Sequence, residues 1–139
     1  MSAPLELRVR LPLAHFELAV DVESSARCLG VFGPSGAGKT SLLEAIAGWR
    51  RPSAGLIRVG QALLFDGAAG RSLPIERRGA GYVPQEALLL PHWSAGGNVR
   101  AGAGRGGAAA AAPGANDELV RRTVAALGIE HLLDRKSGV

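Results

Sequence analysis

One stretch of the chain has residue types and spacing that could hold a phosphate chain. Residues 33–40 read Gly-Pro-Ser-Gly-Ala-Gly-Lys-Thr, which fits the pattern G-x-x-x-x-G-K-[ST] without a mismatch. Glycines let the backbone wrap closely around an anion and point successive N–H groups at it. Lys39 would add a point charge at the β and γ phosphates, and Thr40 would offer a hydroxyl to Mg²⁺. We therefore predict that this loop binds a nucleotide.

The elements around the loop must position it between a strand and a helix. Residues 28–32 read as a short buried strand, and apolar residues recur at helical spacing from Leu42 until Gly48 ends the helix. The helix would direct its positive N-terminal end at the anion. A chance match is the alternative, because a chain with 20 glycines produces glycine motifs easily. The predicted nucleotide-binding residues are Gly33, Pro34, Ser35, Gly36, Ala37, Gly38, Lys39, Thr40 and Ser41.

The length and composition of the chain limit the class of protein to which it can belong. The chain has 139 residues, about one small domain, and its 47% apolar residues suffice for a core. The net charge of +4 comes mainly from scattered arginines, so we expect no nucleic-acid partner. The single cysteine, Cys28, excludes an internal disulfide, and we expect it to be buried in a reducing compartment. No apolar run approaches the roughly 18 residues of a membrane span, and no signal peptide is evident, so a cytoplasmic location is predicted.

Two half-buried strands are predicted before the loop. Apolar and charged residues alternate over residues 5–11, and a second alternation runs over residues 16–22. Phe16 and His15 deserve a separate comment, because a ring near a nucleotide could stack on adenine. However, Phe16 is in phase with Leu18 and Val20, which favours packing in the core.

The segment after the predicted helix alternates short strands with turns. Residues 56–59 and 62–65 read as strands, Asp66-Gly67 as a turn, and residues 74–78 as one helical turn. Residues 81–83 are predicted to return as a strand that Pro84 ends. Gln85 would therefore emerge at a strand end, where side chains commonly reach a ligand.

The last third of the chain is predicted to be a loop followed by a helix. Residues 101–115 are almost wholly Ala and Gly, which we interpret as a flexible loop. Asn116 is the predicted cap of a helix that ends at Gly128. Residues 129–133 indicate one further helical turn. His131 is expected at the surface.

Taken together, residues 33–40 and Gly81-Tyr82-Val83-Pro84-Gln85-Glu86 resemble the ATP-binding subunit of ABC transporters. A finer resemblance, to the molybdate-import branch, rests on Leu64-Phe65-Asp66-Gly67, Leu73-Pro74, Glu76-Arg77-Arg78, Pro91-His92 and Gly97-Asn98-Val99-Arg100. Sulfate and iron importers share several of these motifs and remain alternatives.

The resemblance implies an α/β P-loop NTPase fold. Residues 1–85 would form the N-terminal part of the ATP-binding core, with an antiparallel β part and the phosphate-loop strand and helix. Residues 86–139 would begin the helical subdomain. Residues 33–40 would hold ATP, while Thr40 and Gln85 would hold Mg²⁺, with Gln85 also on the attacking water. Residues 86–100 would face transmembrane permease subunits at the inner face of the membrane, and a second copy would complete a homodimer.

The departures from the family pattern predict that this chain alone does not hydrolyse ATP. The family's Leu-Ser-Gly-Gly signature, its acidic strand end, its catalytic glutamate and its switch histidine are absent from the 139 residues, so the ATPase domain is expected to be incomplete. Half a site positions and stabilises the transferring phosphoryl group poorly. A second reading, a small-molecule kinase or GTPase using the same loop, needs an acceptor site or a guanine-reading Asn-Lys-x-Asp sequence, and neither is found. A third reading is a module that binds nucleotide without turnover.

Overall fold

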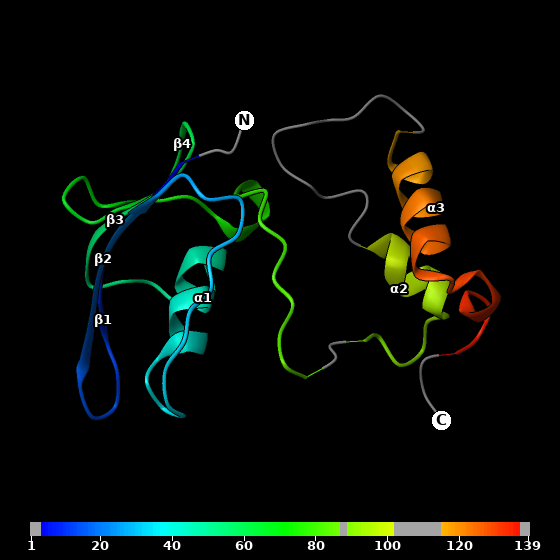
Figure 1. Cartoon of the computed structure of the whole chain (residues 1–139), viewed down its shortest axis with the longest axis horizontal. Coiled ribbons are helices and arrows are strands. Elements are labelled where there is room, and N and C mark those ends of the chain that lie inside the picture. Colours follow the sequence, from blue (N-terminus) through cyan, green and yellow to red (C-terminus); the bar gives the residue numbers. More distant parts are fainter. Residues whose placement is uncertain (1–3, 87–88, 102–114, 137–139) are drawn as a thin grey trace. The chain divides into compact units, whose positions relative to one another are not determined.

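The architecture was obtained as a computed structural model, which describes residues 4–86, 89–101 and 115–136. The chain forms two compact units, residues 1–82 and residues 83–139 (Figure 1). The predicted flexible loop at residues 101–115 falls almost entirely outside the described residues.

The first unit is built on a five-stranded sheet in the order β2-β1-β3-β4-β5, with every neighbouring pair antiparallel. Strand β1 lies between β2 and β3, and its Leu7 pairs with Val22 on one side and with Ile57 on the other. The four strands predicted in these regions are confirmed, whereas the short β5 was missed. The strands are β1 Leu5–Pro12, β2 Glu17–Ser24, β3 Ala54–Val59, β4 Ala62–Asp66 and β5 Arg71–Ser72.

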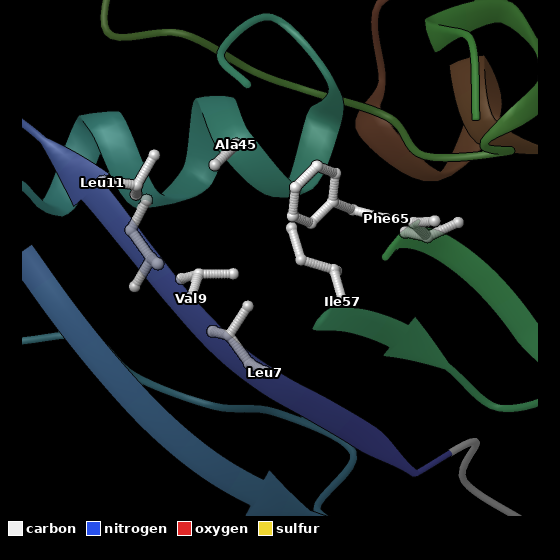
Figure 2. Packing of buried hydrophobic residues seen from close by; sticks show 8 residues of the cluster. Leu7, Val9, Leu11, Ala45, Ile57 and Phe65 are labelled. Atoms are coloured by element: carbon white, nitrogen blue, oxygen red, sulfur yellow. The ribbon is translucent and has the colours of Figure 1, made fainter. Parts of the chain in front are cut away.

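One helix, α1 (Lys39–Ala47), covers one face of this sheet and closes the core. Because side chains alternate along a strand, Leu7, Val9 and Leu11 of β1 all point to that face and are almost fully buried. Figure 2 shows them directed toward Ala45 of α1, beside Ile57 from β3. The helix ends as predicted at Gly48, whose φ of 100° is left-handed.

The opposite face of β1 carries charge. Arg8 contacts Glu23, Asp21 and Glu6, and the hydrogen bond from Arg8 to Glu23 raises the pKa of the guanidinium. Exposed ion pairs of this kind contribute little to stability. Their role here is to keep one face of the sheet polar, which fixes the direction in which the apolar face points.

The strand predicted at residues 28–32 does not form, and the buried position predicted for Cys28 is wrong. Cys28 is exposed, and so are Leu29, Val31 and Phe32, the last with 94% of its surface accessible. A strand exists only where a neighbouring strand accepts and donates its backbone hydrogen bonds. Among the described residues none pairs with this segment. The predicted strand at residues 81–83 is also absent for that reason.

The second unit is helical. It contains α2 (Ala95–Ala101), which was not predicted, α3 (Ala115–Leu127) and a 3₁₀ turn at Glu130–Leu132. The start of α2 is held by the chain's later part, because Ala95 N–H donates to Arg135 O at 2.8 Å and Gly96 N–H donates to Leu133 O at 2.8 Å. Helix α3 begins one residue before the predicted cap and is followed by Gly128 in the left-handed region, as expected. Within the described parts of the chain, no helix has the length and apolar character needed to cross a membrane.

Candidate nucleotide-binding site

The phosphate loop owes its shape to two glycines in the left-handed region. Gly36 has φ 80°, and Gly38, the residue that caps α1, has φ 89°. A Cβ at Gly36 would meet nothing within 4 Å, but a Cβ at Gly38 would lie 2.9 Å from Leu13 Cδ1 and 3.0 Å from Leu18 Cδ2. Gly38 is thus required both by its backbone conformation and by the two leucines packed against it.

Lys39 lies across this loop. Its Nζ donates to Gly33 O at 2.9 Å and to Pro34 O at 2.7 Å. An ammonium has three donors, so the two bonds within the loop leave one for an anion. Lys39 therefore both fixes the loop and places a positive charge at its mouth.

The first turn of α1 is suited to an anion. No side chain caps the N-terminal end of α1, and its first turn contains no acidic residue. The N–H groups of that turn point out of the helix at its positive end, which favours bound phosphate. Thr40, exposed in the same turn, carries the hydroxyl that Mg²⁺ accepts as an oxygen ligand. The loop and its helix together fit a magnesium-bound polyphosphate.

A cavity of about 440 Å³ adjoins the loop. It lies between the turn that joins β1 to β2 and the start of α1, and its lining includes an aromatic ring, Phe16, that is 44% exposed. The expectation that Phe16 packs in the core is wrong. Phe16 precedes the first residue of β2, so the alternation of that strand does not determine where its ring points. The lining residues are Pro12, Leu13, Ala14, His15, Phe16, Gly36, Gly38, Lys39, Thr40, Ser41 and Arg50.

Sequence reasoning therefore identified one wall of this cavity, and of the other wall it considered only Phe16 and His15, as rings that could lie near a base. The glycines, Lys39, Thr40 and Ser41 were identified from the motif, and Gly33 and Pro34 join them through Lys39. Arg50 was not identified. The sequence signal for this second wall was the break in alternation at Pro12. That break predicts a turn between the two strands, but it does not predict that the turn lines a cavity.

Gln85 belongs to the second unit. It is exposed in a bend near the start of the second unit. Thr40 belongs to the first unit, so the predicted joint coordination of Mg²⁺ by Thr40 and Gln85 stays a prediction.

The segment after Gln85 has a defined local geometry. Asn98 of α2 accepts a hydrogen bond from Leu90 N–H at 2.7 Å and donates to Leu90 O at 3.1 Å and to Ser94 O at 3.2 Å. These bonds fold residues 90–94 against α2, and Leu89, Leu90 and Trp93 remain about half exposed. The predicted contact with a membrane subunit falls on this surface.

Comparison with known proteins decides the family. A sequence model of the ABC transporter family matches residues 18–139. The chain belongs to the ABC transporter family. Its fold is accordingly that of the P-loop ATPase domain of these transporters, with the antiparallel sheet and helix described above.

Three curated relatives make the comparison more specific. The molybdenum import ATP-binding protein ModC of Paramagnetospirillum magneticum is 38% identical over 95% of this chain and 35% of its own length. The molybdate/tungstate import ATP-binding protein WtpC of Archaeoglobus fulgidus is 39% identical over 95% of this chain and 50% of its own length. ModC of Rhizobium meliloti is 40% identical over 94% of this chain and 35% of its own length. The chain thus spans about a third to a half of the length of these relatives.

Proposed function

We propose that this chain supplies the ATP-binding part of an importer subunit that couples ATP binding and hydrolysis to the uptake of an oxyanion, molybdate. The observation that carries the nucleotide part is the left-handed loop at Gly36 and Gly38, with Lys39 across it at the uncapped start of α1. The molybdate part is supported by the names of the relatives, which are import proteins for molybdenum or for molybdate and tungstate.

Each residue of the site has a separate task in this proposal. Backbone N–H groups of Gly33 and residues 35–38 hold the phosphates, with Pro34 in the same loop contributing no N–H. Lys39 neutralises the β and γ charges, and Ser41 adds a hydroxyl near the α phosphate. Thr40 and Gln85 hold Mg²⁺, and Gln85 also orients the attacking water. Bound MgATP supplies the phosphoryl group whose transfer to water drives transport.

The proposed partners follow from the same assignment. Transmembrane permease subunits contact the surface formed by Leu89, Leu90 and Trp93, and a second copy of the ATPase subunit completes the assembly at the cytoplasmic face of the membrane. Exposed aromatic and apolar side chains without charged neighbours are typical of the centre of a contact surface. The test is molybdate uptake by cells that carry the intact importer: uptake should be lost with Lys39→Ala in this subunit and should persist with Lys136→Ala. Equal uptake by both variants would contradict the proposal.

The ring of Phe16 is proposed to stack on the adenine base. We expect Phe16→Ala to weaken MgATP binding about tenfold, since removing one aromatic ring from a base contact costs roughly 1–3 kcal/mol. Binding of inorganic tripolyphosphate, which has no base, should not change. Titration calorimetry of both ligands checks this.

The matched control for Phe16 is a second exposed phenylalanine. Phe32 lies outside the cavity beside the phosphate loop, and Phe32→Ala should bind MgATP like the unchanged chain. A parallel loss of tripolyphosphate binding in Phe16→Ala would show that the ring shapes the loop rather than contacting the base.

A further inference from the structure

A buried arginine is attached to the far end of the phosphate-loop helix. In the part of the chain that the structure describes, Arg78 is the buried charged side chain, with 8% of its surface accessible. Its Nη1 donates to Ala45 O and to Ile46 O, both at 2.8 Å, and its Nε donates to Leu73 O at 2.8 Å. Its Nη2 donates to Ser72 Oγ at 3.2 Å.

The hydrogen-bond acceptors of Arg78 explain how its charge is tolerated in a buried position. Ala45 and Ile46 belong to the last turn of α1, whose carbonyls have no partners within the helix and form its negative end. A guanidinium at this position satisfies those carbonyls and opposes their partial charge. Burial lowers the pKa of Arg78, since the charged form loses water. A buried charge is retained at acceptable cost only where such bonds replace the water.

The backbone beside Arg78 is shaped to receive it. Gly48, which ends α1, approaches so closely that a Cβ there would lie 2.7 Å from Arg78 Nε and 2.9 Å from its Cζ. A second contact lies just after the same end of the helix, where the ring centroids of Trp49 and Tyr82 are 6.1 Å apart. Residues 72–82 therefore wrap the C-terminal end of α1, with the 3₁₀ turn at Ile75–Arg77 beside it (Figure 1).

This end of α1 is coupled to the loop by the helix itself. Nine residues at 1.5 Å per residue make a rod of about 13 Å, whose successive turns are joined by backbone hydrogen bonds. Gly38 caps the opposite end, where the backbone must stay in the left-handed conformation between Leu13 and Leu18. A shift or tilt at Ala45 and Ile46 is thereby passed to the N–H groups that face the phosphates.

We propose that Arg78 is a positioning residue for nucleotide binding: by holding the last carbonyls of α1 against residues 72–73, it fixes the axis of the helix and the geometry of the phosphate loop. The inference rests on the proposed nucleotide site. It adds to that site a residue that touches no part of the nucleotide and that the sequence places in an ordinary charged run.

The first test replaces the guanidinium by a point charge. Arg78→Lys retains the charge but cannot reach four acceptors in a planar fork. We expect it to weaken MgATP binding about tenfold, because a loop that is no longer held in one conformation must be ordered when the nucleotide binds. The comparison is made at temperatures where circular dichroism shows the chain folded. Leu64→Val, a core change in β4, is the control for general loss of stability and should bind MgATP normally once folded.

The second test uses the close approach of Gly48. Gly48→Ala should also weaken MgATP binding, because its Cβ displaces the guanidinium. If both variants act on one contact, the double variant Gly48→Ala/Arg78→Lys should bind little worse than either single variant. Additive losses, or normal binding by Arg78→Lys while Lys39→Ala loses binding, would overturn the inference and leave the nucleotide site standing. Normal binding by Lys39→Ala would instead overturn the site itself.

Discussion

Replacing Lys39 by alanine is expected to weaken MgATP binding at least tenfold, which corresponds to about 1.4 kcal/mol. Two effects combine in this loss. The ammonium carries the charge that would face the β and γ phosphates, and its bonds to Gly33 O and Pro34 O hold the loop in its conformation. Isothermal titration calorimetry of the folded chain measures the change directly.

The chain offers a matched control for this experiment. Lys136 is the only other lysine, it is exposed, and it lies in the second unit. Lys136→Ala lowers the net charge by the same amount and should leave MgATP affinity unchanged. Because the Lys39 contribution is partly electrostatic, affinity of the unchanged chain should also fall with added salt more steeply than that of Lys39→Ala. Equal affinities of Lys39→Ala and the unchanged chain would exclude the phosphate-loop assignment.

The features that could be predicted from the sequence are those encoded by near neighbours. The alternation around Leu7 and Val9 defines which face of β1 is buried, whatever the rest of the sheet does. Gly48 and Gly128 end their helices because only glycine adopts the left-handed conformation without strain, so the residue type itself marks the position. The same local rule located the bend of the phosphate loop at Gly36 and Gly38.

The features that could not be predicted depend on distant partners. An apolar run such as residues 28–32 has the composition of a buried strand, but it becomes one only when another strand pairs with it. The burial of Phe16 was predicted wrongly for a different reason. Alternation with Leu18 predicts the direction of a side chain only when both residues belong to one strand, and β2 begins one residue after Phe16.

Arg78 is the clearest case of burial that sequence alone does not reveal. It follows Glu76 and Arg77 in a charged run of the kind that usually faces water, and both of those neighbours are exposed. What separates Arg78 from Arg77 is the position of the last turn of α1, more than thirty residues earlier in the chain. The sequence does not show which backbone carbonyl groups need a hydrogen-bond donor from elsewhere in the chain.

Phosphate release is expected to be absent from the 139-residue chain, although the chain should bind MgATP. In-line attack needs a water held and polarised by a carboxylate, and the described residues that line the cavity beside the loop include none. Lys39 and Thr40 can bind the phosphates and the metal, but binding that is equally strong before and during the reaction does not raise its rate. Steady-state phosphate release, compared with Lys39→Ala to remove contaminating activity, should therefore stay at background.

The complementary experiment adds the missing groups. The three relatives compared above extend well beyond the matched region, so a chimera joining residues 1–139 to the remainder of such a relative's ATPase domain should hydrolyse ATP. In the chimera, Gln85→Ala should abolish or strongly reduce turnover, since Gln85 is proposed to join Mg²⁺, the attacking water and the permease contact. Its neighbour Glu86, also exposed, is the control: Glu86→Gln should retain most of the activity. Turnover by the 139 residues alone that Lys39→Ala abolishes would mean that the catalytic groups lie within this chain and have been assigned to the wrong residues.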